Sequence, residues 1–382
     1  MSRQIDTQVC VVGGGVIGAS IAYFLSRANI QVVLLESALI GSTGATGRSR
    51  GILRVYDPLP PLARLGKIGV QFYLKWAEAG DLGSSPTRHG GLLYRLHSQS
   101  VAQARAIAAA LDSEELPLIV TRYAELKERH KSLGWNDADW VIFEPRGGYG
   151  DPLLTAQKLI AASRARGATV LERSKVQRLV RLPHDWRVHV QDLRVTARVV
   201  VLATGAYSTD LICDLPSYTR SIPIPSFSSH EPLPSAAVVD EIAHTYLRPE
   251  SAHQFVAGCQ VFSEGHWSEL PAEVTPSQVV DARDRAALVL PMNVELTSIG
   301  GTSGFDSYTR DLMPLIGHIS QAPDLIVATG LSGRGYKMAP AVGMAVTRLI
   351  GRGYDLGRAL VDSDTIDLSA FSPSRVQDLA GV

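Results

Sequence analysis

Three glycines near the start of the chain have the spacing of a phosphate-binding turn. Gly13, Gly15 and Gly18 form a G-x-G-x-x-G pattern between an apolar stretch and an expected helix. The first permits a sharp turn, the second lets backbone N–H groups approach a pyrophosphate, and the third lets helix and strand pack closely. Glu36 follows a second apolar strand, 18 residues after Gly18, where its carboxylate can accept hydrogen bonds from a ribose. The pattern predicts a dinucleotide site, and the acid disfavours NADP because it would repel the ribose phosphate.

A second glycine-rich turn lies near the other end of the chain. Residues 324–351 run from an apolar strand through a glycine-rich loop into a helix expected to open near 339–340. Another strand, at 198–203, runs into Thr204 and Gly205. A nicotinamide-binding domain normally completes its site within the first half of a chain. Two glycine turns so far apart therefore predict a longer dinucleotide that is held from both ends of the sequence.

Five segments form an ordered set along nearly the whole chain: GGGVIGAS with Glu36, GATGRSRGILR (44–54), EPRGGYGDP (144–152), ARVVVLATGAYS (197–208) and ATGLSGRGYKMAPAVG (328–343). In this order they resemble the D-amino acid oxidase superfamily of FAD-dependent oxidoreductases, and within it the sarcosine oxidase and glycine oxidase type. The resemblance implies an FAD cofactor. The contacts that it implies for FAD are Gly13, Gly15, Val16, Ile17, Gly18, Glu36, Ser37, Thr43, Arg48, Ser49, Arg50, Gly51, Val176, Ala203, Thr204, Gly205, Gly330, Ser332, Gly333, Arg334, Gly335, Tyr336 and Lys337.

Two cations, Lys337 and Arg54, are the first candidates for holding a substrate. In the sarcosine oxidase type, the lysine of the segment that matches GRGYK helps to bind the substrate carboxylate, so the resemblance implies this role for Lys337. The arginine that matches Arg54 grips the same carboxylate, and an arginine fork suits a carboxylate better than a lysine does. The alternatives are a solvated loop lysine and an inter-domain ion pair.

Two further candidates, Asp306 and Tyr246, concern the rest of the substrate. Asp306 stands where some sarcosine oxidases carry the cysteine that attaches the flavin, and where glycine oxidases place a carboxylate-binding arginine. FAD is therefore expected to be non-covalent. Asp306 either faces the substrate, repelling a carboxylate and favouring an ammonium, or pairs with Arg310. Tyr246 matches a substrate-facing tyrosine, with plain packing as the alternative, and the oxygen-activating lysine of the sarcosine type falls near Val256.

Composition bounds the class of protein. The chain has 382 residues, of which 45% are hydrophobic, and 37 basic side chains balance 37 acidic ones. Zero net charge gives no electrostatic reason to bind nucleic acid or an anionic membrane. No apolar run reaches the roughly 18 residues of a spanning helix. Neither the ten histidines nor Cys10, Cys213 and Cys259 have metal-ligand spacing. A cytoplasmic protein without a metal, monomeric or homodimeric, is expected.

The expected fold is α/β, with a Rossmann-like FAD-binding domain interleaved with an α+β substrate domain built on a mostly antiparallel sheet. We assign residues 1–85, 150–215 and 306–382 to the first domain, and 86–149 and 216–305 to the second. Within them, Asp151 is expected to cap a helix, residues 215–234 to form a proline-rich crossing linker, and residues 286–292 to form a strand.

The expected reaction is oxidation of the C–N bond of an amine or amino acid to an imine, by hydride transfer to the flavin N5 atom. Secondary, cyclic or N-substituted amines are favoured, and oxygen, a protein or a quinone would take the electrons. Because the amine must be neutral to lose a hydride, activity should rise with pH. The alternatives are a 2-hydroxy acid or proline-type dehydrogenase, and a flavin-binding subunit without turnover. Arg54 and Lys337 favour an enzyme, because a scaffold needs no carboxylate clamp.

Overall fold

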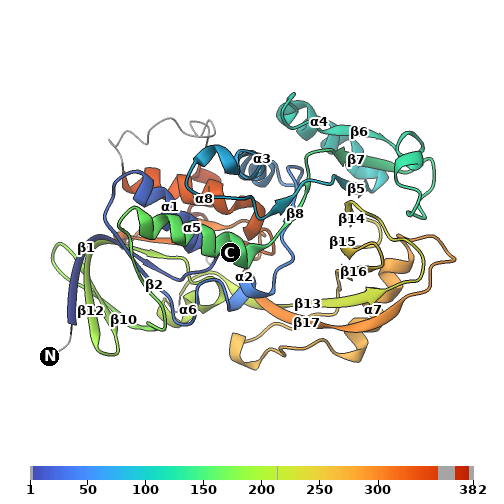
Figure 1. Cartoon of the computed structure of the whole chain (residues 1–382). Helices are drawn as coiled ribbons and strands as arrows, with labels where there is room; N and C mark the ends of the chain where they lie inside the picture. Colours follow the sequence, from blue (N-terminus) through green and yellow to red (C-terminus); the bar gives the residue numbers. More distant parts are fainter. Residues whose placement is uncertain (1–2, 213, 352–365, 378–382) are drawn as a thin grey trace.

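The computed structural model describes residues 3–212, 214–351 and 366–377. Two sheets of 8 strands each, together with a small sheet of 3 strands, form its framework. Figure 1 shows the first large sheet at one end of the molecule, with helices α1, α5 and α8 over one face, and the second sheet at the other end. The arrangement confirms the expected α/β fold with a second, mostly antiparallel part.

The first sheet is parallel at its centre. β1 pairs in parallel with β2 and β12, β2 pairs with β9, and β12 pairs with β19. Both faces of β1 are buried, because Val9 and Val11 pack in one apolar cluster and Cys10 and Val12 in another. This explains the continuous apolar run. The strands are β1 (Arg3–Val12), β2 (Val32–Leu35), β9 (Thr169–Leu171), β10 (Val176–Arg181), β11 (Trp186–Val190), β12 (Leu193–Leu202), β18 (Leu315–Ile319) and β19 (Ala322–Thr329).

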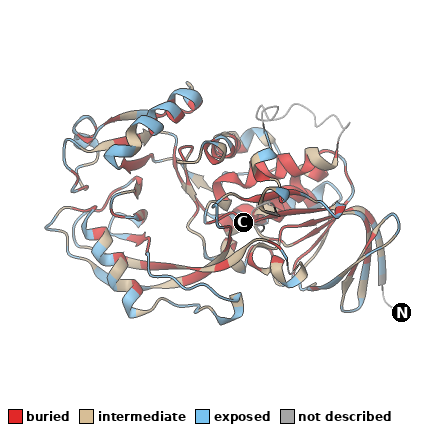
Figure 2. Ribbon diagram, turned by 180° about the vertical axis from the view of Figure 1, so that it is seen from behind, coloured by how far each residue is buried: buried red, intermediate tan, exposed pale blue. Residues whose placement is uncertain are grey.

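Three helices pack against this sheet: α1 (Val16–Arg27), α5 (Pro152–Ala165) and α8 (Gly335–Ile350). A fourth, α3 (Pro60–Leu74), packs on α8. Asp151 caps α5, as expected, by accepting from the Leu154 N–H at 2.9 Å. α8 is buried along residues 336–347, and Figure 2 shows this burial where the helices face the sheet. The other described α-helices are α2 (Gly44–Arg48), α4 (Val101–Leu111), α6 (Ser208–Leu211), α7 (Pro276–Ala287) and α9 (Ser374–Gln377).

The second sheet has the order β17-β13-β16-β15-β14-β5-β7-β6, and its pairs are antiparallel except for β14 with β5. The small sheet joins β3 (Ile52–Leu53), β4 (Thr87–Arg88) and β8 (Gly148–Gly150). The second sheet consists of β5 (Leu92–Leu96), β6 (Ile119–Arg122), β7 (Trp140–Glu144), β13 (Tyr218–Ser228), β14 (Ala237–Asp240), β15 (Thr245–Ser251), β16 (Gln254–Ala257) and β17 (Thr297–Tyr308).

The linker expected at 215–234 is wrong, because β13 is a long strand paired with β17 along most of its length. The Ser221 N–H bonds the Ser263 carbonyl rather than β17. With a strand period of two, the nitrogens of Pro223 and Pro225 face the same way. β16 begins to pair only at Ser226, so no ladder bond is lost at either proline.

The strand expected at 286–292 is also wrong. α7 extends through Ala287, and the N–H groups of Val289 and Leu290 both bond the Ala286 carbonyl. A capping box between Thr275 and Gln278 begins this helix. The expected domain limit at 305/306 falls within β17, which stays in the second sheet through Tyr308. The domain limits remain a prediction.

Candidate active site

The glycine turns and Glu36 meet at one edge of the first sheet. β1, β2, β12 and β19 run parallel, so the residues that follow their carboxyl ends lie together. Gly13 N donates to the Leu35 carbonyl at 2.8 Å, and Ala203 N donates to the Val12 carbonyl at 2.9 Å. Ligands of open α/β sheets bind at this edge.

The three glycines of the first turn have different surroundings. A Cβ atom on Gly13, whose φ is +103°, would lie 2.5 Å from the Ala203 carbonyl oxygen, and one on Gly18 would lie 1.9 Å from the Gly13 carbonyl oxygen. A Cβ atom on Gly15 would meet only Thr46, with Oγ1 at 3.1 Å. Gly13 and Gly18 therefore permit packing, whereas Gly15 keeps space beside the N-terminus of α1. That space and the helix N-terminus fit the pyrophosphate of FAD.

Glu36 is held rigidly beside this turn. Its carboxylate accepts from Gly14 N at 2.6 Å, Ala38 N at 2.7 Å and Ser37 Oγ at 3.0 Å. An ionised carboxylate has about four acceptor positions, so one further donor, such as a ribose hydroxyl, fits. Ser174 N bonds the Glu36 carbonyl at 2.7 Å, and this places the start of β10, with Val176, nearby.

The remaining residues expected to contact FAD lie around this edge or beside it. Thr43 precedes α2, and Thr204 Oγ1 lies 2.8 Å from Ser208 Oγ. Ser49 Oγ accepts from Gly51 N at 3.2 Å. Arg48 packs on β17, because a Cβ atom on Gly304 would lie 2.6 Å from the Arg48 Cβ. Arg50 lies 3.9 Å from Glu250 on β15. Their contacts with FAD remain predictions.

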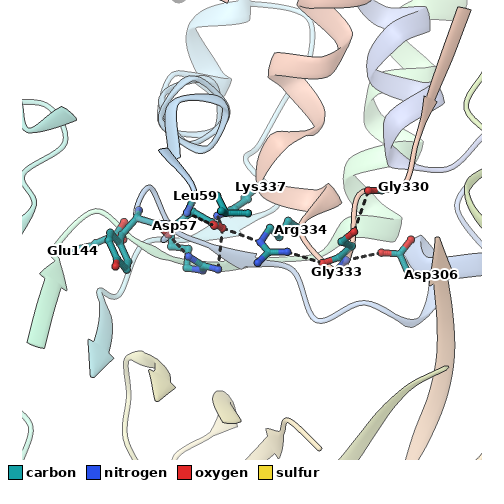
Figure 3. Close-up of polar contacts among 11 residues, drawn as sticks. Asp57, Leu59, Glu144, Asp306, Gly330, Gly333, Arg334 and Lys337 are labelled. Carbon is teal, nitrogen blue, oxygen red and sulfur yellow. Dashed lines mark hydrogen bonds and ion pairs between the residues drawn. The ribbon is translucent and has the colours of Figure 1, made fainter. Parts of the chain in front are cut away.

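A buried cluster of charged side chains lies where α8 begins (Figure 3). Asp57 is fully buried, and its Oδ2 atom accepts from Lys337 Nζ at 2.9 Å, Arg334 Nε at 2.9 Å and Arg54 Nη2 at 3.3 Å. Oδ1 accepts from Leu59 N at 3.3 Å. The side chains of Lys337, Arg54 and Arg334 are 3%, 13% and 17% exposed. Three cations therefore share one carboxylate oxygen away from bulk water.

Burial and neighbouring charges set the pKa values in this cluster. Burial acts to raise the pKa of Asp57, but Lys337, Arg54 and Arg334 outweigh it and hold that pKa well below its usual range. Burial, together with the two arginines, lowers the pKa of Lys337 to about 7, against the opposing effect of Asp57. Because arginine keeps its proton in proteins, Lys337 is the cation of the cluster that titrates near neutral pH.

Arg54 is fixed by its own neighbours. Its Nη1 atom donates to the Tyr56 carbonyl, and its guanidinium lies 5.4 Å from the centroid of the Tyr94 ring. Glu144 is buried and accepts from Val55 N at 2.6 Å and Tyr56 N at 2.9 Å, which holds the backbone after Arg54. Burial raises the pKa of Glu144, although these two bonds oppose it.

Lys337 lies in the first turn of α8, which begins at Gly335 rather than near 339–340 as expected. Pro340 has no N–H for the Tyr336 carbonyl four residues earlier. The Tyr73 hydroxyl, from α3, donates to that carbonyl instead at 2.9 Å. The proline is thus accommodated inside the helix, and its neighbour on α3 helps to fix the turn that carries Lys337.

The loop before α8 is held in an uncommon conformation. Ser332 has a φ of +49°, which residues other than glycine rarely adopt. Its N–H bonds the Ser307 carbonyl at 3.0 Å, and its carbonyl accepts from Arg334 Nη1 at 3.1 Å. These contacts offset the local strain. They also fix the direction of the Arg334 side chain.

Asp306 anchors the same loop. Its carboxylate accepts from Gly333 N at 2.9 Å and Ser307 N at 2.8 Å, as Figure 3 shows for Gly333. The alternative pair with Arg310 is wrong, because Arg310 lies 3.5 Å from Glu264. Burial raises the pKa of Asp306 to about 6, although its two amide bonds oppose the shift. Arg334 links this carboxylate's loop to Asp57.

Tyr246 lies on β15, in the second sheet. Burial raises the pKa of Tyr246 to about 12, and the positive charges of Arg50 and Arg248 act in the opposite direction. In the described part of the chain, no hydrogen bond joins Tyr246 to Arg54 or Lys337. The same ranges contain no group of three or more His, Cys, Asp or Glu suited to a metal ion. Nor do they contain a helix long and apolar enough to cross a membrane.

Three residues that shape the site are not among those predicted from the sequence. Thr46 Oγ1 accepts from Val16 N at 2.9 Å at the start of α1, and Asp57 and Glu144 organise the charged cluster. Glu144 opens the segment EPRGGYGDP, and Asp57 ends the segment GILRVYD, in which Arg54 is the only other charged residue. A charged residue in such a segment needs a buried partner, and that signal could have found Asp57.

Comparison with known proteins finds relatives that match most of this chain. Glycine oxidase of Bacillus licheniformis is 25% identical over 373 residues, covering 92% of this chain and 94% of that protein. The 4-methylaminobutanoate oxidase (formaldehyde-forming) of Paenarthrobacter nicotinovorans is 25% identical over 95% of this chain, which spans only 45% of that enzyme. The crystal structure of L-proline dehydrogenase from P. horikoshii shares the fold, with a TM-score of 0.84 at 21% identity, covering 98% of this chain and 99% of that one.

The family model described as FAD dependent oxidoreductase (DAO) matches residues 8–349. The match includes both glycine turns, Glu36 and the whole Asp57 cluster. The chain therefore belongs to the DAO family of FAD-dependent oxidoreductases.

Proposed function

We propose that the protein oxidises the C–N bond of an amine or amino acid to an imine, with FAD bound non-covalently. The observation that carries this proposal is the cluster of Lys337, Arg54 and Arg334 on the single carboxylate of Asp57. One negative charge faces three positive ones, which favours binding of a further anionic group. Both relatives named above, glycine oxidase and 4-methylaminobutanoate oxidase, have names that denote a molecule with an amine and a carboxylate.

Each part of the site has a role in this proposal. Lys337 and Arg54 bind the substrate carboxylate, and their burial strengthens the attraction because little water screens it. The Gly15 turn and Glu36 hold the cofactor. FAD, when bound, supplies the electron acceptor for the hydride that leaves the carbon beside the amine nitrogen. Asp306 and Tyr246 face the remainder of the substrate.

The anionic Asp306 favours an amine over a second acid at its position. A carboxylate held there would be repelled, whereas a secondary, cyclic or N-substituted ammonium would be attracted before it loses its proton. Oxygen, a protein or a quinone then accepts the electrons. The oxygen-activating lysine of the sarcosine type falls near Val256, which is buried on β16 and provides no cation for oxygen.

Anaerobic bleaching of the flavin tests the proposed reaction, because it needs no knowledge of the natural acceptor. The panel contains N-methyl and cyclic amino acids, glycine, and 2-hydroxy acids. We expect bleaching by N-substituted or cyclic amines. Bleaching by 2-hydroxy acids alone would identify the dehydrogenase alternative, and no bleaching by any member would favour a flavin-binding subunit without turnover.

Non-covalent attachment predicts that FAD leaves the polypeptide on acid or heat denaturation. Asp306 replaces the attaching cysteine, and Cys10 and Cys259 are buried thiols. Cys213 lies outside the described residues. We expect all the yellow colour in the supernatant after precipitation, with the absorbance of free FAD. Flavin that stays with the pellet after washing in denaturant would contradict the prediction.

Asp306→Asn is expected to shift substrate preference towards amines with an acid group near this position, because the substitution removes a negative charge at nearly constant shape. The loss of one charged acceptor should also cost about 1–3 kcal/mol of stability. The measurement is kcat/KM across the amine panel, alongside thermal unfolding. An unchanged ranking with lowered stability would limit Asp306 to anchoring the Gly333 loop.

A further inference from the structure

We propose that Asp57 is the positioning residue of the anion site: its carboxylate gathers Lys337, Arg54 and Arg334 on one oxygen and favours the charged form of the Lys337 amine. The inference deepens the proposed function, because it rests on the substrate carboxylate binding at these cations. In this inference Asp57 does not touch the substrate, yet it controls how tightly the substrate carboxylate binds.

The positions of the three cations require a shared partner. Arg54 comes from the segment after β3, Arg334 precedes the first residue of α8, and Lys337 lies in its first turn. Like charges this close repel one another, and burial removes the water that would screen them. Asp57 Oδ2 bonds all three at 2.9–3.3 Å, so these separate segments are held together by one atom.

Lys337 is the member of this cluster whose charge depends on Asp57. The charged groups with the largest effect on the pKa of its amine are Arg54, Asp57 and Arg334. Glu144 also interacts with Lys337, but more weakly than with Arg54. Glu144 directs its oxygens to the amides of Val55 and Tyr56 rather than to the lysine. On α3, Gly66 lies beside this amine, with a Cβ position 3.7 Å from Nζ.

The sign of the effect follows from these neighbours. Burial, Arg54 and Arg334 lower the pKa of Lys337 to about 7, and Asp57 acts in the opposite direction. Removing the Asp57 charge therefore lowers that pKa further. Lys337 then becomes neutral at pH 7, and the anion site loses one of its positive charges. A merely structural Asp57 would weaken the site equally at every pH.

Binding of acetate to the FAD-loaded protein measures this directly, through perturbation of the flavin absorbance as a function of pH. In the unmodified protein, acetate affinity should fall as pH rises through about 7. In Asp57→Asn the midpoint should move to lower pH by about 1–3 units. Below that midpoint the affinity should equal or exceed that of the unmodified protein, because a competing negative charge is gone.

Two further variants separate charge control from general damage. Lys337→Met should bind acetate with little pH dependence in this range, and adding Asp57→Asn to it should shift no midpoint. Asp240→Asn is the matched control, because Asp240 is a buried carboxylate that accepts from Arg95 at 3.2 Å in the second sheet. It should leave the acetate midpoint unchanged even if the protein unfolds at a lower temperature.

The inference is overturned if Asp57→Asn keeps the midpoint of the unmodified protein, if the shift persists without Lys337, or if acetate does not bind. If Asp57→Asn does not retain FAD, Asp57→Glu is the variant to measure, because it keeps the negative charge. The inference then requires that the pH midpoint of acetate binding in Asp57→Glu stays near 7. Failure of the proposed function has a different signature, since acetate would bind with the expected pH dependence while amines fail to bleach the flavin.

Discussion

Gly15→Val is expected to give a folded protein that purifies without FAD. A Cβ atom at Gly15 would meet only Thr46 within the protein, with Oγ1 at 3.1 Å, so the fold needs only a small shift of that side chain. The same side chain would fill the space beside the N-terminus of α1 where the pyrophosphate is proposed to bind. Crowding of this kind costs about 1–3 kcal/mol, which raises the dissociation constant of FAD by roughly one to two decades.

The measurement is the flavin absorbance of the purified variant, followed by titration with FAD and by circular dichroism. Gly265→Val is the matched control, because a Cβ atom there would meet only Glu269 Oε2 at 3.7 Å, away from the first sheet. Gly18→Val should behave differently and fail to fold, since its Cβ atom would lie 1.9 Å from a backbone oxygen. A yellow Gly15→Val protein with normal FAD affinity would place the pyrophosphate elsewhere.

The cofactor turn could be predicted from sequence because its parts are local. Gly13, Gly15 and Gly18 lie within six residues, and each has a requirement that only glycine meets. Only one helix and one strand separate Glu36 from this turn in the sequence. The helix cap at Asp151 is local in the same way, because the carboxylate and the amide that it accepts from are three residues apart.

The charged cluster could not be predicted in this way because its members meet only in the folded chain. Asp57 and Lys337 are 280 residues apart, and Glu144 lies 89 residues from the Val55 amide that it holds. Resemblance to a family supplied Lys337 and Arg54 but gave no role to Asp57. Pairing of Asp306 with Arg310, one of the two alternatives that the sequence leaves open, rests on proximity in sequence alone. In the structure, β17 directs Asp306 to the Gly333 loop instead.

Predictions based on proline positions are wrong where tertiary contacts compensate for the missing N–H. Pro340 marked the expected start of α8, yet the helix begins at Gly335 because the Tyr73 hydroxyl satisfies the carbonyl that proline leaves free. Pro223 and Pro225 indicated a linker, yet both lie in β13 where their nitrogens face no paired strand. In each case the exception depends on a neighbour distant in sequence.

Lys337→Met and Arg54→Ala are each expected to lower kcat/KM for the best amine by roughly one to two decades while FAD remains bound. Each variant loses one charge-assisted contact with the substrate carboxylate, worth about 1.5–3 kcal/mol. Stability should change little. Breaking a buried ion pair is costly when it leaves a charge without a partner, but here two cations remain on Asp57 in either variant, and one source of repulsion among the cations is removed.

The readouts are anaerobic flavin reduction, steady-state kinetics and thermal unfolding of the FAD-loaded variants. Arg310→Ala is the matched control, because Arg310 is 77% exposed and pairs with Glu264 outside the cluster. It should leave kcat/KM unchanged. If Lys337→Met and Arg54→Ala both reduce the flavin at the normal rate, the substrate carboxylate binds on another side of the site. If either variant loses FAD instead, the cluster serves the cofactor rather than the substrate, because a substrate clamp can be weakened without releasing the cofactor.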